Sequence, residues 1–91
     1  MTTVNGGVAG LVRTLVIELA PIRVNALHPA IVGDSPQWID MPKERRDALV
    51  ARTPTRKLVT MAEVVDATRF LLENPAINGI DLAVDGGWLC M

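Results

Sequence analysis

Two short apolar segments, far apart in the sequence, constrain the fold of this chain most strongly. Residues 22–27 read Ile-Arg-Val-Asn-Ala-Leu and are closed by His28-Pro29, while residues 80–84 read Ile-Asp-Leu-Ala-Val, and both segments predict short β-strands. So much chain between two strands favours a parallel pair with a right-handed crossover. A two-stranded parallel sheet leaves both of its edges uncovered. The chain is therefore expected to be a slice of a larger α/β sheet, completed by self-association or by a partner.

Residues 2–20 predict a helix with threonine caps at its start, which Pro21 ends. Its apolar residues recur at helical spacing and form one stripe, made of Val8, Leu11, Val12, Leu15, Val16 and Leu19. Gly6, Gly7 and Gly10 each weaken this helix by roughly 1 kcal/mol relative to alanine. They indicate that another backbone comes close on that face, either inside the domain or across a subunit interface.

Two further helices are expected between the strands. Residues 43–52 are charged and predict a helix that Thr53-Pro54-Thr55 ends. Thr60 and Glu63 have the spacing of a capping box, in which each side chain satisfies a free backbone amide of the other's turn. A third helix should run from there to about residue 73 and bury Val64, Ala67, Thr68, Leu71 and Leu72. The order is then helix, strand, helix, helix, strand, in a single partial domain over residues 1–91.

The composition argues against several classes of partner and location. A formal charge of −1 gives no electrostatic reason to expect nucleic acid or an anionic membrane. The longest apolar stretch, residues 15–19, contains Glu18 and is far too short to span a bilayer. No signal peptide is visible, and Cys90 is the only cysteine, so a cytoplasmic protein without an internal disulfide is expected.

Three stretches of the sequence together resemble one enzyme family. Residues 7–26 run from Gly-Val-Ala-Gly-Leu-Val-Arg to Pro-Ile-Arg-Val-Asn-Ala, residues 53–65 contain Thr-Pro-Thr-Arg-Lys-Leu-Val-Thr and Ala-Glu-Val-Val, and residues 79–87 read Gly-Ile-Asp-Leu-Ala-Val-Asp-Gly-Gly. In this order and spacing they are similar to the C-terminal part of short-chain dehydrogenase/reductases, over essentially the whole chain. The resemblance implies a Rossmann-like fold and an NAD(P)-dependent oxidoreductase.

The same resemblance implies that the family's catalytic groups are missing. Its Tyr-x-x-x-Lys acid/base pair would fall at Met1 and Asn5, and the chain contains no tyrosine. Methionine has no proton to exchange with a carbonyl, and asparagine has no charge with which to lower a neighbour's pKa. The family's catalytic serine, and its glycine-rich turn that binds the cofactor pyrophosphate, have no counterpart either. We therefore expect no catalytic residue in this chain and no hydride transfer by the isolated chain.

One cofactor-binding segment of the family does have a counterpart. The family's Pro-Gly motif corresponds to Pro29 and Ala30, followed by Ile31 and Val32, and these four residues are candidate cofactor-binding residues by resemblance alone. Asp34 stands where the family often has a threonine, and a carboxylate close to a cofactor phosphate would be repulsive. NAD or NADP is implied for the family, whereas no cofactor and no metal are expected for the isolated chain.

Several other residues invite a functional interpretation beside a structural one. His28 could be a base or a ligand, but no carboxylate is placed in the sequence to orient it, so a structural role at the strand end is favoured. Asp81 and Asp85 favour turn capping over paired acid/base chemistry. Trp38 and Met41 lie where the family has a substrate lid, and they either pack or line a pocket.

The remaining features concern surfaces. Residues 43–47 mix both charge signs and predict a solvated helix face. Residues 88–91 form an apolar tail that is expected to dock on the domain or on a neighbouring subunit, and Cys90 lacks a basic neighbour that would make it reactive. Two functions stay open: an oxidoreductase by descent, and a catalytically dead remnant that acts as a self-associating module. A homo-oligomer, a dimer or another even-numbered assembly, is expected in either case.

Overall fold

The structure, a computed structural model, describes residues 2–88, with side chains described from Gly7 onward. Its elements follow the predicted order: α1 (Thr2–Glu18), β1 (Ala26–Pro29), α2 (Lys43–Arg52), α3 (Met61–Glu73) and β2 (Asp81–Val84). The predictions on Met1, Leu89, Cys90 and Met91 lie outside the described residues, as do those on the side chains of Asn5 and Gly6. None of the helices in the described part is long and apolar enough to cross a membrane.

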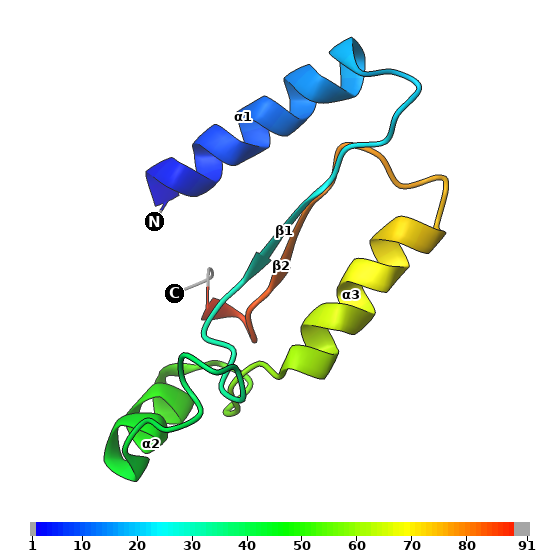
Figure 1. Ribbon diagram of the computed structural model, residues 1–91. Coiled ribbons are helices and arrows are strands. Elements are labelled where there is room, and N and C mark those ends of the chain that lie inside the picture. Colours follow the sequence, from blue (N-terminus) through cyan, green and yellow to red (C-terminus); the bar gives the residue numbers. More distant parts are fainter. Residues whose placement is uncertain (1, 89–91) are drawn as a thin grey trace.

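The two strands form the middle layer of the molecule. They pair in parallel, with Ala26 opposite Asp81 and Pro29 opposite Val84. α1 lies along one side of this sheet and α3 along the other, and both helices run against the strand direction (Figure 1). α2 lies beyond the carboxyl ends of the strands (Figure 1). This arrangement confirms the predicted α/β class, with two parallel strands joined by a helical crossover.

β1 begins later than predicted: residues 22–27 were expected, and Ala26–Pro29 are observed. Just before β1, the side chain of Asn25 forms hydrogen bonds to the backbone that leads into β2. The Asn25 side chain accepts a hydrogen bond from the Ile80 amide (2.9 Å) and donates one to the Ile77 carbonyl (3.2 Å). Because this side chain replaces a backbone partner, the regular ladder starts only at the next residue on each strand. The expected start of β2 is therefore also one residue early.

The helix predictions fare better. α2 has the predicted bounds, and α3 begins with the predicted capping box: the Glu63 amide donates to Thr60 Oγ1 (3.2 Å), and the Thr60 amide donates to Glu63 Oε1 (2.9 Å). At the other end of α3, the guanidinium of Arg23 donates to backbone carbonyls at 2.8–3.0 Å, those of Leu71, Leu72, Asn74 and Ile77. α1 ends at Glu18, slightly before the expected residue 20.

The apolar core of the described residues is small. It consists of Val12 in α1, Val59 before α3, and Leu71 in α3. Two residues of α3 that were predicted to be buried, Leu72 (71% exposed) and Thr68, are exposed instead. Leu11 (57% exposed) and Leu19, which belong to the predicted apolar stripe of the first helix, are exposed as well. The reason is geometric, because a sheet of two strands is too narrow to cover the apolar faces of the helices on both of its sides.

Candidate functional site

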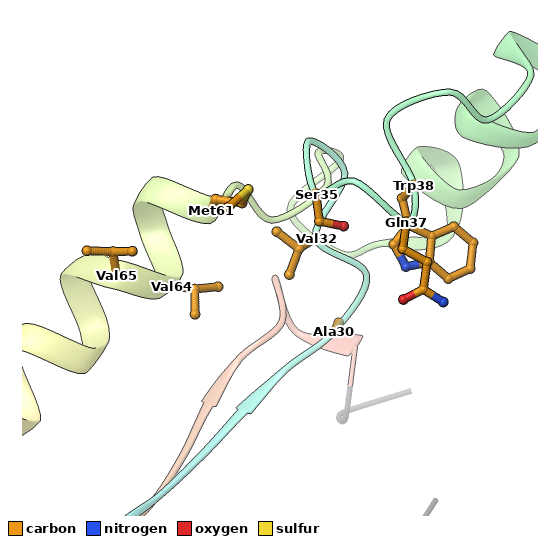
Figure 2. A pocket seen from close by; sticks show the side chains of 8 residues that line it. All are labelled: Ala30, Val32, Ser35, Gln37, Trp38, Met61, Val64 and Val65. Carbon is orange, nitrogen blue, oxygen red and sulfur yellow. The ribbon is translucent and has the colours of Figure 1, made fainter.

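A cavity of about 300 Å³ lies beyond the carboxyl end of β1. The loop that leaves β1 forms one side of it, and the first turns of α3 form the other (Figure 2). Its lining is mostly apolar, with one hydroxyl and one side-chain amide: Ala30, Val32, Ser35, Gln37, Trp38, Met61, Val64 and Val65. In open α/β sheets, ligands bind outside the carboxyl ends of the strands, so this cavity is the candidate site.

The four candidate cofactor residues do not all face this cavity. Ala30 and Val32 line it, whereas Ile31 lines a separate void too narrow to admit a water molecule, and Pro29 is exposed at the end of β1. The chain is extended here, so alternate side chains point to opposite sides. Only the two alternate residues, Ala30 and Val32, can contact a ligand in this cavity.

The loop is tied to the segment before α3. Val32 pairs with Val59 in an isolated parallel bridge, and the Gly33 amide donates to the Val59 carbonyl at 2.8 Å. Gly33 is buried, and a Cβ at this position would come within 2.9 Å of two Leu58 side-chain atoms. A side chain at residue 33 would push the loop away from α3, so glycine here keeps the cavity narrow.

Asp34 has a structural partner that the sequence did not reveal. Its Oδ1 accepts a hydrogen bond from the Met61 amide at 2.7 Å, across 27 residues of sequence. The first amides of a helix have no partner within the helix, and the N-terminus favours negative charge. Asp34 thus joins the loop to the start of α3, and its carboxylate lies beside the cavity wall formed by Met61.

A carboxylate and an amine pair at the same end of the sheet. Lys57 Nζ lies 2.7 Å from Glu63 Oε2, and both residues line a hollow of about 450 Å³ at the end of β2. Lys57, together with the hydrogen bond from the Thr60 amide, holds the pKa of the Glu63 carboxyl below its ordinary value. Lys57 and Glu63 therefore neutralise each other, and the Glu63 carboxylate also accepts a hydrogen bond from a free amide at the start of α3.

Trp38 lines the cavity, and Met41 does not, although the two were predicted together.

The charged helix after them, α2, was expected to present a solvated face, and the exposed side chains of Lys43 and Glu44 agree with this expectation. It fails for Arg46, which is half-buried and donates from Nη2 to the carbonyls of Gly33 (2.9 Å) and Trp38 (3.2 Å). No local pattern in the sequence indicates that Arg46 contacts this loop.

His28 has a carboxylate partner, contrary to the expectation from the sequence. Its Nε2 lies against Asp81 Oδ1 on the neighbouring strand, and the histidine side chain is 16% exposed. Asp85 is buried and caps a turn, since its Oδ1 accepts from the Gly87 amide at 2.9 Å. His28 and Asp81 do not line the cavity, and their contact lies between the two strands. Among residues 2–88, no group of three possible metal ligands comes together.

Comparison with known proteins decides the family. A family model described as enoyl-(acyl carrier protein) reductase matches residues 1–89. A solved short-chain dehydrogenase/reductase from Burkholderia xenovorans superimposes with a TM-score of 0.75 at 32% identity, covering 94% of this chain and 32% of that one. The chain belongs to the short-chain dehydrogenase/reductase family.

Its relatives within the short-chain dehydrogenase/reductase family include proteins named as dehydrogenases and reductases. The 2-(R)-hydroxypropyl-CoM dehydrogenase of Xanthobacter autotrophicus is 37% identical over 94 residues, which cover 96% of this chain and 37% of that protein. Human 3-oxoacyl-[acyl-carrier-protein] reductase is 39% identical over 85 residues, and the match covers 90% of this chain and 34% of that protein. The crystal structure of a small-chain dehydrogenase in complex with NADPH gives a TM-score of 0.77 at 30% identity, covering 98% of this chain and 42% of that one.

The chain spans little more than a third of the length of the curated short-chain dehydrogenase/reductases it matches. The described elements are therefore a slice of the family's Rossmann-like fold, as the sequence predicted. The loop from Ala30 to Trp38 and the start of α3 are the part of that slice that lies at the carboxyl ends of its strands.

Proposed function

We propose that this chain supplies part of the ligand-binding wall of an NAD(P)-dependent oxidoreductase, and that residues 1–91 alone transfer no hydride. The supporting observation is the cavity between the loop after β1 and the start of α3. Its position matches the place where open α/β sheets bind ligands. The proposed compartment is the cytoplasm, because a single cysteine forms no internal disulfide.

The lining of the cavity suits one end of a nicotinamide cofactor. Ala30, Val32 and Trp38 offer apolar surface for a flat ring, and the Gln37 amide and Ser35 hydroxyl can hydrogen-bond an uncharged carboxamide. No lysine or arginine lines the cavity in the described part of the chain. A pyrophosphate needs converging amides or cations, so these residues fit the nicotinamide end of the cofactor only.

In the proposed reaction, this wall would bind part of the cofactor, and groups outside these 91 residues would carry out the chemistry. A bound NAD(P)H supplies the hydride. The wall residues hold flat apolar groups in place and exclude water from them. In the family, a tyrosine exchanges the proton with the substrate oxygen, and the chain has no tyrosine.

Residues 1–91 should show no cofactor-dependent turnover of ketones or alcohols. General acid/base catalysis contributes roughly 10²–10⁴-fold, and cofactor positioning is lost as well. The measurement is absorbance at the reduced nicotinamide band, with human 3-oxoacyl-[acyl-carrier-protein] reductase as the positive control. Calorimetric titration should give dissociation constants for NAD and NADP weaker than about 1 mM. Turnover by the pure chain, or micromolar binding, contradicts this half of the proposal.

A chimera tests the other half. Residues 7–91 replace the matching segment of human 3-oxoacyl-[acyl-carrier-protein] reductase, joined after that enzyme's own acid/base pair. The chimera is expected to oxidise NADPH with a ketone substrate, because the donor enzyme provides the phosphate site and the proton-transfer groups. A folded chimera that binds NADPH and yet shows no turnover would argue against a wall role for these residues.

A second function, a self-associating module without catalysis, is favoured by a different observation. Large apolar side chains are exposed on both helices that flank the sheet, including Ile17 (79%) on α1 and Phe70 (54%) on α3. Large apolar side chains left open to water on a helix favour association. The proposed partner is a second copy of this chain in an even-numbered homo-oligomer. A solution mass twice that of one chain, or another even multiple, would support this second function.

A further inference from the structure

The cavity wall that carries Trp38 is a loop, residues 33–39, and α2 holds this loop from outside. Arg46 on α2 donates from Nη2 to the carbonyl of Gly33 at 2.9 Å and to that of Trp38 at 3.2 Å, while the Ile39 carbonyl lies at 3.5 Å. One guanidinium therefore reaches both ends of the loop. The loop also closes on itself, because the amides of Trp38 and Ile39 both donate to the Ser35 carbonyl.

α2 has few other means of holding the loop. None of its residues is fully buried, so the helix contributes little apolar packing. Arg46 is half-buried, and in that setting a hydrogen bond from a charged donor is stronger than one exposed to water. Its neighbour Arg45 lies over the Trp38 ring, with Cζ 5.2 Å from the ring centroid. Two adjacent arginines thus contact the backbone and the ring of the same tryptophan.

The position of the loop determines the width of the cavity. Trp38 and Gln37 lie on one side of it, and Met61 and Val64 of α3 lie on the other (Figure 2). Arg46 also packs closely against the backbone of Gly33, since its Nη1 would come within 3.0 Å of a Cβ at that residue. The Gly33 end of the loop is also bonded to Val59, and Asp34 is bonded to Met61. A shift of the guanidinium would therefore free the Trp38 end of the loop and let the tryptophan move away from α3.

We propose that Arg46 is a positioning residue of this site: by linking the Trp38 end of the 33–39 loop to its Gly33 end, it sets how far Trp38 stands from α3 and so which flat apolar groups of a ligand fit between them. The inference rests on the proposed wall function and adds the residue that fixes the wall. Arg46 itself does not line the cavity and acts through Trp38.

Fluorescence of Trp38 tests the proposal without any need for catalysis. Trp88→Phe leaves Trp38 as the only tryptophan, and in this background Arg46→Met is compared with Arg46→Lys. Removing the guanidinium should shift Trp38 emission to the red and raise its quenching by acrylamide about twofold or more, as the loop opens. Arg46→Lys keeps the charge but cannot reach both carbonyls, so it should restore the emission only in part. Arg69→Met, an exposed arginine on α3, is the matched control and should change nothing.

Helix content from circular dichroism accompanies each variant. Unchanged Trp38 quenching in a folded Arg46→Met chain overturns the proposal, whereas loss of NAD(P)-dependent activity in a chimera would bear only on the proposed function. A measurement on the unsubstituted chain covers the case in which the variant does not fold. A guanidinium held at two carbonyls should give separate, slowly exchanging Nη proton resonances for Arg46 and averaged ones for exposed Arg69. Averaged Arg46 signals would equally overturn the proposal.

Discussion

At the scale of single residues, the start of α3 concentrates the polar contacts that define one side of the cavity. The amides of Met61 and Glu63 donate to Asp34 Oδ1 and Thr60 Oγ1, and the Thr60 amide donates to Glu63 Oε1. Most of the free amides at this helix end thereby gain partners. Because Met61 also lines the cavity, these caps fix the angle at which α3 meets the loop.

The Glu63 carboxyl makes the start of α3 sensitive to pH. Lys57 and the Thr60 amide lower its pKa in the folded chain, so its charged form adds stability at neutral pH. That contribution is present above the ordinary pKa of 4.5 and is lost as the pH falls through the lower, folded value. Glu63→Gln keeps the capping geometry without the charge, so it should unfold more easily than the unsubstituted chain at pH 7 and by a smaller margin at about pH 3.

Urea unfolding at the two pH values, followed by circular dichroism, measures this difference. Asp66→Asn removes an exposed carboxylate from the same helix and serves as the control, with a smaller change between the two pH values. An equal loss of stability for Glu63→Gln at both pH values would show that the charge of Glu63 contributes nothing.

The residues at this site differ in how far sequence could predict them. Thr60 and Glu63 are three positions apart, and the geometry of a helix start dictates their contact, so the capping box was predictable. Asp34 contacts Met61 across 27 residues, and Arg46 contacts Gly33 and Trp38 only because α2 folds back on the loop. Such contacts depend on tertiary structure, and no local pattern encodes them.

At the scale of elements, one arginine connects the segment before β1 to the end of α3. The Arg23 guanidinium is hydrogen-bonded to the carbonyls of Leu71, Leu72, Asn74 and Ile77. The last carbonyls of a helix have no partner within it, and a cation at this end is favoured. Arg23 therefore fixes the crossover at the end of α3 that lies away from the cavity.

Arg23→Met should destabilise the fold by about 1–2 kcal/mol, since partly buried carbonyls would lose a charged donor. Arg23→Lys should recover only part of this loss, because an ammonium lacks the planar fork that spans several carbonyls. Chemical denaturation gives the free energy, and amide exchange locates the loosening, which is expected in the last turn of α3. Arg13→Met on α1, where the arginine is exposed, is the control. A loss no larger than the control's would mean that Arg23 contributes only surface charge.

The ends of the helices were predictable from local sequence, whereas the start of β1 depends on tertiary contacts. The sequence predicted α2 and α3 correctly, because caps and breakers lie within or next to each helix. It placed β1 too early, because apolar content alone does not reveal that Asn25 pairs through its side chain with Ile77 and Ile80. A strand begins where its partner's backbone is available, and that is a property of both strands together.

At the scale of the whole molecule, the chain exposes more surface than a folded monomer of its size should. Its accessible surface is 6333 Å², whereas about 5,200 Å² is expected for 9.8 kDa. Its radius of gyration is 15.0 Å, compared with roughly 12 Å for a compact chain of this length. The excess, on the order of 1,000 Å², is about what one partner contributes to an interface of standard size.

The excess surface leads to the prediction that the chain self-associates. Leu11 and Ile17 on α1 are exposed, and nothing in the described residues lies within 4 Å of a Cβ placed at Gly7 or Gly10. The alternative that these glycines pack against a backbone inside the domain is therefore wrong for the described part. An open glycine face beside exposed apolar residues suits a second helix at close range, and a second copy of α1 in a two-fold arrangement supplies one.

Light scattering after gel filtration should accordingly give a dimer or another even-numbered assembly at tens of micromolar. Gly10→Leu would hold the partner helices apart and should weaken association about tenfold or more, as a bulky side chain does in a close contact. Ala48→Leu makes a comparable change at an exposed position of α2 and should leave the mass unaltered. A well-folded monomer would refute self-association. An assembly whose mass Gly10→Leu leaves unchanged would move the contact away from α1, and the open edges of β1 and β2 would then be the surfaces left to pair.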